Sequence, residues 1–283
     1  MKKLTLIVFT TFVLTILPMA ELFAQADRIK PPTNNNTSAN PKPPKKKPTR
    51  PDTDMTAGMS ADEIFAIGLD YFKSGDNEQA RTWFKKAADK GHAHSQFELG
   101  YIYENALGVP QDYKQAAYWY RKAAEQGNFY AQSSLGLLYE EGRGVQKDYK
   151  QAFYWYRQAA EHGNAPALFN LGDCYAYGIG VEQDYVQAAS WYRKAADKDF
   201  APAQHMLGLL YVQGQGVPKD YNQAVYWLRK AAEKGYANAQ CSLGDCYYTG
   251  IGVTKDISIA RFWWQKAATQ GNEKAKRSLQ NCN

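Results

Sequence analysis

Leucine recurs at one interval of 36 residues along most of this chain, and this period constrains the fold more than any other feature. The leucines are Leu99, Leu135, Leu171, Leu207, Leu243 and Leu279. Each of the first five is followed by glycine, and tryptophan keeps the same interval in a second phase from Trp83 to Trp263. A period of this length indicates one supersecondary unit stacked several times, because each unit has a face that it cannot bury alone. The chain is therefore predicted to be a repeat array.

Each unit contains two segments of helical periodicity, which we name helix A and helix B. Helix A carries an apolar stripe around the repeat leucine, and glycines such as Gly142 end it. Helix B begins at an aspartate that is followed three residues later by glutamine, as in Asp148 and Gln151. This pair predicts a reciprocal N-terminal cap. Counting both patterns along the chain predicts about thirteen helices and an all-α fold.

The segment before the array resembles a targeting signal followed by a spacer. Two lysines, an apolar run from Leu4 to Leu17 and the small-residue motif ending at Ala26 predict that residues 1–26 are a signal peptide cleaved after Ala26. The run is shorter than the about 20 residues that span a bilayer, so we expect no integral membrane span in the mature chain. An uncleaved N-terminal anchor is the alternative. The protein is predicted to be periplasmic or secreted.

Residues 27–58 are rich in proline, lysine and asparagine and are expected to be a disordered linker. The repeat array is expected to occupy residues 59–283. Its units are predicted near 60–93, 94–129, 130–165, 166–201, 202–237 and 238–272, with a capping helix at 273–283.

Positive charge is concentrated before the array. Through residue 58 the chain has nine Lys or Arg against four Asp or Glu, so only +1 of the net charge of +6 belongs to the array. Nucleic-acid binders usually carry a basic face on the folded domain, and we therefore expect no nucleic-acid partner. The run PKPPKKKP at 41–48 is interpreted as a solvated spacer. Its attraction to an anionic surface such as phospholipid or a wall polymer is the alternative.

Three of the four cysteines, Cys174, Cys246 and Cys282, share one phase of helix A that other units fill with isoleucine or leucine. This predicts buried thiols that pack as small apolar groups. A disulfide between Cys246 and Cys282 stays possible if the last helix frays.

No set of side chains has the spacing of a catalytic or metal site. His92, His94 and His162 lie at or near the turns between units. His205 stands alone on a helix A, and all four histidines are expected at the surface. Capping explains the periodic aspartates. We therefore expect a protein that is not an enzyme, with no metal and no cofactor.

The repeat unit reads A-x-x-x-L-G-x-x-Y-x-x-G-x-G-V-x-x-D-Y-x-Q-A-x-x-W-Y-R-K-A-A, and residues 131–160 follow it almost position for position. This unit resembles the Sel1-like repeat (SLR), a variant of the tetratricopeptide (TPR) repeat with a longer turn between its helices. The resemblance covers about Ser60 to Asn283 and implies a right-handed αα superhelix. Ala106 and Asp199 replace turn glycines, and we expect only local adjustment there. The resemblance also implies scaffold roles in bacterial envelope processes, signalling or host contact.

We expect function to lie on the concave surface of the array, where helix A residues point away from the core between helices A and B. These residues stand two before, two after and five after the repeat leucine, and they differ between units. The candidates for binding are Phe97, Tyr101, Glu104, Leu137, Glu140, Phe169, Asp173, His205, Leu209, Asp245 and Tyr248. Exposed aromatic side chains often anchor interfaces, although some of these could instead pack against the next helix.

The sequence therefore predicts a scaffold or adaptor of the bacterial cell envelope that holds a partner protein or peptide in its concave groove. A peptidoglycan-binding or cell-wall-binding protein, or a weak wall-acting enzyme, is one alternative. A secreted factor that engages a host is another.

Overall fold

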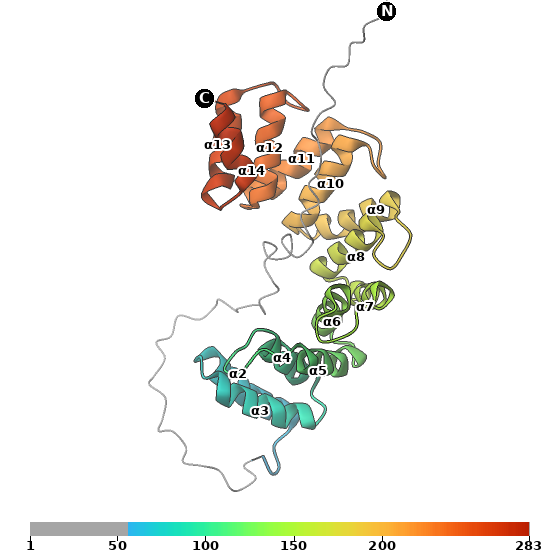
Figure 1. Cartoon of the computed structure of the whole chain (residues 1–283), viewed down its shortest axis with the longest axis vertical. Helices are drawn as coiled ribbons and strands as arrows, with labels where there is room; N and C mark the ends of the chain where they lie inside the picture. The colour runs from blue at the N-terminus through green and yellow to red at the C-terminus, as the bar shows by residue number, and fades with distance from the viewer. Residues whose placement is uncertain (1–55, 283) are drawn as a thin grey trace, which may run out of the picture. The chain divides into compact units, whose positions relative to one another are not determined.

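The computed structural model describes residues 56–282, and within them thirteen α-helices follow one another without a strand (Figure 1). The A helices are α2 (Ala61–Lys73), α4 (Ala93–Glu104), α6 (Phe129–Glu141), α8 (Ala165–Tyr177), α10 (Ala201–Gln213), α12 (Ala237–Thr249) and α14 (Glu273–Asn281). The B helices are α3 (Asn77–Asp89), α5 (Tyr113–Glu125), α7 (Tyr149–Glu161), α9 (Tyr185–Asp197), α11 (Tyr221–Glu233) and α13 (Ile257–Thr269). The predicted signal peptide and nearly all of the predicted linker lie outside the described residues.

Neighbouring helices pack in chain order. Each A helix contacts the B helix that follows it most extensively, and each B helix contacts the next A helix. A helices of neighbouring pairs also touch, at α4 with α6, α6 with α8 and α10 with α12. The A helices thus form one layer and the B helices the other, which confirms the predicted all-α solenoid. Among residues 56–282, none of the helices combines the length and the apolar character that crossing a bilayer demands.

The start of helix B departs from the predicted reciprocal cap. Asp148 accepts hydrogen bonds from the backbone N–H groups of Lys150 and Gln151, as expected of an N-cap. Its own N–H, however, donates to the carbonyl oxygen of Tyr139 at 2.9 Å. Because helix A already satisfies that donor, the glutamine side chain has no capping partner to reach. The full capping box forms at Ser60 with Glu63, where the chain enters the first helix.

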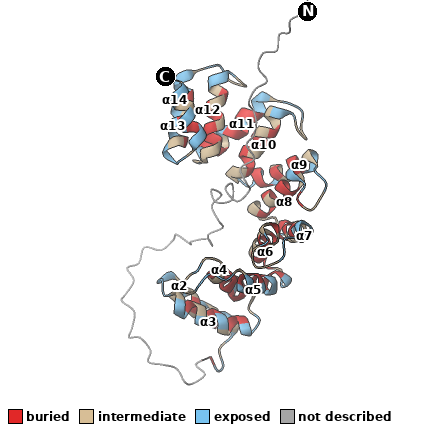
Figure 2. Ribbon diagram, in the orientation of Figure 1, coloured by how far each residue is buried: buried red, intermediate tan, exposed pale blue. Residues whose placement is uncertain are grey.

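Small residues let the two helices of a pair approach closely. The first alanine of every B helix is completely buried, and these residues are Ala80, Ala116, Ala152, Ala188, Ala224 and Ala260. The glycine after each repeat leucine lies under a large side chain of helix B. A Cβ added at Gly100, for example, would lie 2.4 Å from Cδ1 of Tyr120. Figure 2 shows the resulting buried band along the helices of the array.

Recurrent glutamines join four of the A helices to the preceding B helix. The side-chain amides of Gln96, Gln132, Gln204 and Gln240 donate to the carbonyl oxygens of Ala88, Ala124, Ala196 and Ala232 at 3.1–3.2 Å. Those carbonyl groups lie in the last turn of a helix, where each also accepts a backbone hydrogen bond from the turn residue three positions later. The glutamine amide therefore adds a second donor at the helix end and binds neighbouring pairs to one another.

The two turn residues that replace glycine keep the left-handed backbone of the glycine. Ala106 has φ of 55° and Asp199 has φ of 69°. Asp199 also forms an ion pair with Lys234 and accepts a hydrogen bond from Gln204 at 3.1 Å. The expected local adjustment is confirmed, because the helices on either side keep their positions in the repeat.

Candidate functional site

The predicted binding residues all lie on A helices, but they differ in exposure. Phe97, Glu140, Phe169, Asp173 and His205 are buried. Tyr101, Glu104, Leu137, Leu209 and Asp245 are half-buried, and Tyr248 is 40% exposed. The expectation that these positions open to solvent is therefore wrong for the five buried side chains.

The acidic candidates are buried or half-buried because helix B supplies each of them with a hydrogen-bond donor. An aromatic side chain of helix B crosses over the glycine of helix A and donates to a carboxylate on the far side. The pairs are Tyr120 with Glu104 (2.6 Å), Tyr156 with Glu140 (2.9 Å), Tyr192 with Asp173 (2.5 Å) and Trp264 with Asp245 (2.9 Å).

Donor and acid occur together within the chain. Two units have an aromatic or aliphatic residue without a polar group at this position of helix B, namely Phe84 and Leu228. In those units both candidate acid positions are apolar, with Leu69 and Phe72 in α2 and with Leu209 and Val212 in α10. The carboxylates are thus acceptors for buried donors, and their placement follows the packing of each pair.

Burial changes the protonation of these carboxyl groups. Desolvation raises the pKa of Asp173 to about 8, although the hydrogen bond from Tyr192 opposes this, and it raises the pKa of Glu140. Desolvation also raises the pKa of Glu98 to about 7. Glu98 is buried on α4, and its Oε2 atom has no hydrogen-bond partner. Sequence reasoning did not single out Glu98, because its phase lies one residue before the repeat leucine.

The side chains two residues before the repeat leucine pack against the next pair. The ring of Phe97 lies 5.7 Å from that of Tyr130, and the ring of Phe169 lies 5.6 Å from that of Phe200. His205 follows the same rule, with its ring 5.5 Å from that of Tyr236. These contacts explain why the three side chains are buried.

His205 is the main correction among the histidines, because it was expected at the surface. Its Nε2 atom lies 3.1 Å from Oγ of Ser242 on the neighbouring helix α12. Desolvation, helped by the charge of Lys274, lowers the pKa of His205 to about 4. The ring is therefore neutral at physiological pH and serves as a packing element between units.

The accessible part of the A layer is smaller and more apolar than predicted. Of the predicted candidates, Tyr101, Leu137, Leu209 and Tyr248 keep accessible apolar surface. Tyr177 on α8 is 45% exposed and was missed, because it lies six residues after the repeat leucine. The five A helices from α4 to α12 contain no lysine or arginine at all, although they hold six acidic residues. The accessible face is thus aromatic and aliphatic and lacks basic side chains from these five helices, whose six acidic side chains are buried or half-buried.

A second surface, on the B helices, was also missed by sequence reasoning. Tyr118, Tyr154, Tyr226 and Phe262 keep the 36-residue interval and are 44–51% exposed. Each ring stands edge-on to the tryptophan that follows it, at 4.9–5.2 Å between centroids. We name these four residues the outer ridge. The signal was present in the sequence as a large apolar residue repeated outside the buried stripe of helix B.

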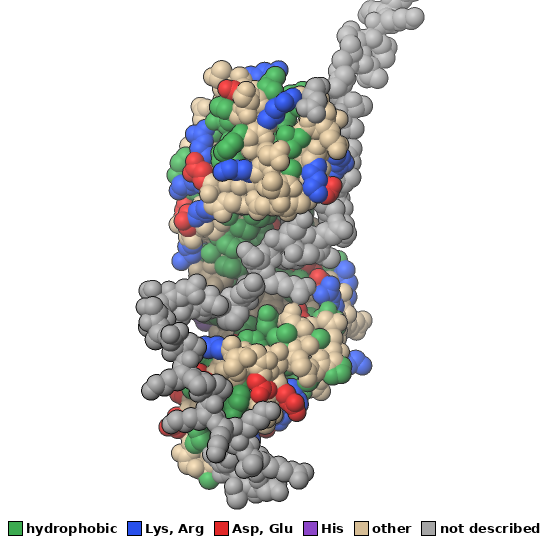
Figure 3. Space-filling view, turned by 90° about the vertical axis from the view of Figure 1, so that its left-hand side faces the viewer, with side chains coloured by type: hydrophobic (Ala, Val, Ile, Leu, Met, Phe, Trp, Pro, Cys, Tyr) green, Lys and Arg blue, Asp and Glu red, His purple; other side chains and the backbone are tan. Residues whose placement is uncertain are grey.

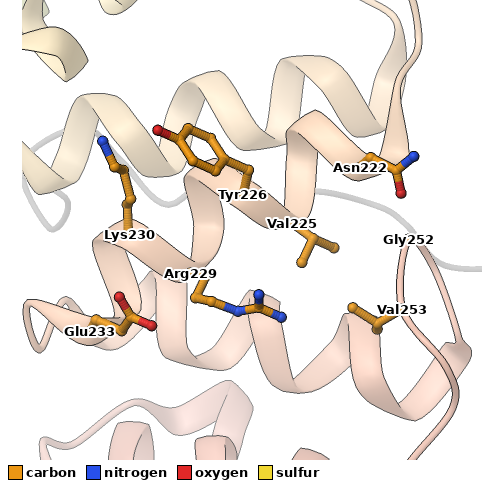
Figure 4. A pocket seen from close by; sticks show the side chains of 8 residues that line it. All are labelled: Asn222, Val225, Tyr226, Arg229, Lys230, Glu233, Gly252 and Val253. Atoms are coloured by element: carbon orange, nitrogen blue, oxygen red, sulfur yellow. The ribbon is translucent and has the colours of Figure 1, made fainter.

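Two shallow cavities lie along the B helices, and the first of them includes Tyr226 of the outer ridge. One of about 420 Å³ is lined by residues of α11 and of the turn before α13, including Tyr226, Arg229 and Val253 (Figure 4). A second of about 560 Å³ is lined by Arg121, Val145 and their neighbours. Arg121 and Val145 are the repeat equivalents of Arg229 and Val253. On the face that Figure 3 presents, basic, acidic and apolar side chains are interspersed.

The described residues hold no group of three or more His, Cys, Asp or Glu side chains that could bind a metal ion. Cys174, Cys241 and Cys246 are buried free thiols, as predicted for the phase of Cys174 and Cys246, whereas Cys282 is half-buried at the end of α14. Burial raises the pKa of the Cys241 thiol to about 12 and that of Cys246 to about 11.

Comparison with known proteins gives one family. A model described as the Sel1 repeat matches six consecutive segments, residues 59–92, 93–128, 129–164, 165–200, 201–236 and 237–272.

Two solved structures are similar at 39% sequence identity with a TM-score of 0.73. One is a Sel1 repeat protein from Oxalobacter formigenes, where the match covers 76% of this chain and 86% of the other. The second is a protective antigen of uropathogenic Escherichia coli strains with an SLR fold, where it covers 79% of this chain and 49% of the other.

Among curated proteins, similarity is confined to short stretches. The exopolysaccharide production negative regulator of Rhizobium leguminosarum bv. viciae is 33% identical over 63 residues, which is 21% of this chain and 24% of that protein. The DAP3-binding cell death enhancer 1 of Rattus norvegicus is 37% identical over 46 residues, 16% of this chain and 9% of that protein. The chain thus spans a quarter or less of the length of these curated relatives.

Proposed function

The chain belongs to the Sel1 repeat family, whose members are generally protein-interaction scaffolds, and from this premise we propose that it is a non-catalytic adaptor. It holds an extended segment of a partner protein against its layer of A helices. One observation carries the proposal. The units agree in the residues that pack the core, whereas the position two residues after the repeat leucine is Tyr101, Leu137, Asp173, Leu209 or Asp245. Such variation suits a surface on which each unit contacts a different part of one partner.

The hydrogen-bond pairs of the A layer support binding over catalysis. The carboxylates that could act as acids or bases accept hydrogen bonds from tyrosine and tryptophan within the same pair. The buried thiols have raised pKa values, which disfavours the nucleophilic thiolate. A nucleophile, a base and an orienting group do not converge among the described residues.

The accessible side chains have the chemistry of an interface. Tyr177 and Tyr248 offer large, rigid aromatic surfaces on the A layer, and aromatic side chains are enriched among residues that dominate binding energy. Leu137 and Leu209 add apolar area next to them in the repeat. The partner segment is therefore expected to bring apolar side chains into contact with successive A helices.

We further propose that the protein acts in the cell envelope. The order of lysines, apolar run and small-residue motif before Asp27 is that of a secretory signal. Fractionation of producing cells together with N-terminal sequencing tests this part. A mature chain that begins at Asp27 outside the cytoplasm agrees with it, and a full-length chain in the cytoplasm contradicts it.

Capture of partners from crosslinked envelope fractions tests the adaptor function. The wild-type chain is compared with Tyr101→Ala/Leu209→Ala on the A layer and with Val186→Ala as a matched control on a B helix, where Val186 is 64% exposed. We expect one protein that the wild type and the control retain and that the A-layer variant loses. Equal recovery by all three chains would place the partner elsewhere.

A further inference from the structure

The two layers of the array carry opposite charge. The A helices from α2 to α12 hold nine acidic residues against one basic residue, Lys73. The B helices from α3 to α13 hold fourteen basic residues against six acidic ones. The last A helix, α14, adds three basic residues and one acidic residue, so the formal charges are −6 for the A helices and +8 for the B helices, beside the six aspartates at the N-caps of the B helices. The near-neutral total charge of the array conceals a basic face.

Lysines accompany the outer ridge at a fixed geometry. The Nζ atom of Lys122 lies 5.1 Å from the ring centroid of Tyr118, and that of Lys230 lies 5.1 Å from the centroid of Tyr226. Lys266 lies 4.7 Å from the centroid of Phe262. Each ammonium group stays in solvent while its stem covers part of the aromatic surface. Every such site thus joins a positive charge to a half-exposed ring.

At Tyr226 and Lys230, a cavity extends the site into a groove between neighbouring pairs. In Figure 4, Tyr226 and Lys230 stand side by side on α11, and Arg229 reaches toward Val253 of the following turn. Arg229 donates to the hydroxyl of Tyr247 at 2.9 Å, which holds its guanidinium at the floor of the groove. Arg121 and Arg193 make the same contact with Tyr139 and Tyr211. An arginine held by a tyrosine of the following A helix is therefore a repeated feature of the array.

We propose that the outer ridge and its groove bind an acidic, extended segment of a second protein, on the face opposite the A layer. Carboxylates of the segment pair with Lys122, Lys230 and Lys266, and its apolar side chains pack on the exposed rings between them. Charge complementarity selects the sign of the partner. The aromatic residues supply the desolvated contact area on which affinity depends.

The adaptor would then have two faces of opposite chemistry. Its A layer contacts one partner through apolar side chains, and its B layer recruits an acidic partner. This inference is independent of the proposal for the A layer, because no residue is shared between the two surfaces.

The chain itself supplies conservative substitutions for a test. Ser190 occupies the ridge position in α9, and Gln158 occupies the lysine position in α7. Serine and glutamine are therefore compatible with the fold at these two positions. We choose Tyr118→Ser/Tyr226→Ser/Phe262→Ser as the ridge variant and Lys122→Gln/Lys230→Gln/Lys266→Gln as the charge variant.

Fluorescence anisotropy with the full chain measures binding of a labelled peptide of about 15 residues, long enough to extend over roughly 50 Å, in which glutamate alternates with leucine and glycine. We expect the ridge variant to weaken binding by about tenfold or more. The charge variant is expected to weaken it severalfold and to reduce its dependence on salt. A matched peptide with lysine in place of glutamate should not bind.

The basic N-terminal segment requires its own control, because Lys45, Lys46 and Lys47 could attract an acidic peptide. The variant with glutamine at these three positions is expected to keep most of the affinity. Loss of binding in this variant with full binding by the ridge variant would overturn the proposal. Equally tight binding of an oligonucleotide or a uronate oligosaccharide of the same charge would also overturn it, because plain charge attraction would then suffice.

Carbodiimide crosslinking on the wild-type chain gives a readout that does not depend on a variant folding. Peptide carboxylates should become linked to Lys122, Lys230 and Lys266. Crosslinks confined to lysines outside the B helices would contradict the assignment. If these crosslinks are absent but the A-layer variant still loses its partner in the capture experiment, the outer-ridge proposal fails and the adaptor proposal stands.

Discussion

The hydroxyl of Tyr192 donates a 2.5 Å hydrogen bond to Oδ1 of Asp173, and both side chains are buried between α8 and α9. In the preceding pair, Tyr156 reaches Glu140 instead, three positions further along its A helix. The carboxylate occupies a different position of helix A in the two pairs, but the tyrosine hydroxyl of helix B donates to it in both. The A layer is therefore built by matching each donor on helix B with an acceptor on helix A.

Replacing one member of this pair should lower the free energy of unfolding more than replacing both. Asp173→Leu leaves the buried hydroxyl of Tyr192 without an acceptor, which destabilises the fold by about 1–3 kcal/mol. Asp173→Leu/Tyr192→Leu reproduces the apolar pair of Leu209 and Leu228 and should recover at least half of that loss. Urea denaturation of the four chains of this double-mutant cycle measures the coupling. Additive losses would contradict the pairing.

An acid at the alternative position should restore the hydrogen bond. Asp173→Leu/Ala176→Glu places the carboxylate five residues after Leu171, where Glu140 stands in its own unit. We expect this chain to be more stable than Asp173→Leu alone, because Tyr192 regains an acceptor. A stability equal to or below that of the single variant would mean that the site tolerates the acid at one position only.

The Asp173 carboxyl should make a contribution to stability that falls as pH rises. Burial raises the pKa of Asp173 from 3.8 to about 8, so between these values the folded chain binds a proton that the unfolded chain has released. The free energy of unfolding then decreases with pH, by up to about 1.4 kcal/mol per pH unit for this group. Asp173→Asn removes this contribution. Denaturation at pH 5 and pH 8 should show a smaller decrease for the variant than for the wild type, and equal decreases would exclude Asp173 as a source.

Two glycines of one turn should differ sharply in their tolerance of alanine. Gly178 and Gly180 both have φ of 70°, but a Cβ at Gly178 meets atoms no closer than 3.5 Å. At Gly180 it would lie 2.0 Å from the carbonyl oxygen of Tyr149 in the preceding pair. Gly178→Ala should cost about 1–2 kcal/mol for its left-handed backbone, as Ala106 does in its own turn. Gly180→Ala should cost more than about 3 kcal/mol or prevent folding, and thermal melting of both chains checks the order.

The thiols should react in an order set by burial. Cys282 is half-buried at the end of the last helix, whereas Cys174, Cys241 and Cys246 lie in the interior. A thiol reagent added to the native chain should label Cys282 first, and the other three should react only after unfolding. Mass spectrometry of the labelled peptides reads the order. Rapid native labelling of Cys174 would show that the core of α8 opens readily.

The fold was predictable because its signals are local and repeated. Period, caps and turn glycines such as Gly142 each depend on a few neighbouring residues, and six units carry the same pattern. The reciprocal cap at Gln151 was predicted wrongly, because the competing acceptor for the N–H of Asp148 is a carbonyl group of the preceding helix, at Tyr139. The spacing of residues within one helix does not predict such contacts between helices.

The candidate site was predicted less well for the same reason. Helical phase places Asp173 and Glu140 on the open side of helix A, but it cannot reveal that a tyrosine of helix B reaches across a glycine to meet them. A comparison of the units with one another predicts the pairing, since the unit with Leu228 at the donor position has Leu209 at the acid position. The outer ridge at Tyr118 and Tyr226 was not predicted, because its half-exposed aromatic residues lie outside the buried stripe by which helical periodicity identifies helix B.

The central claim is that the A layer holds a protein partner, and site-specific photocrosslinking tests it most directly. A photoreactive phenylalanine analogue replaces Leu137, Leu209 or, as a control on the B layer, Val186. The account predicts that the chains modified at Leu137 and Leu209 become linked in cells to the same protein and that the chain modified at Val186 does not. Crosslinks to that protein from Val186 alone, or from none of the three positions, would contradict it.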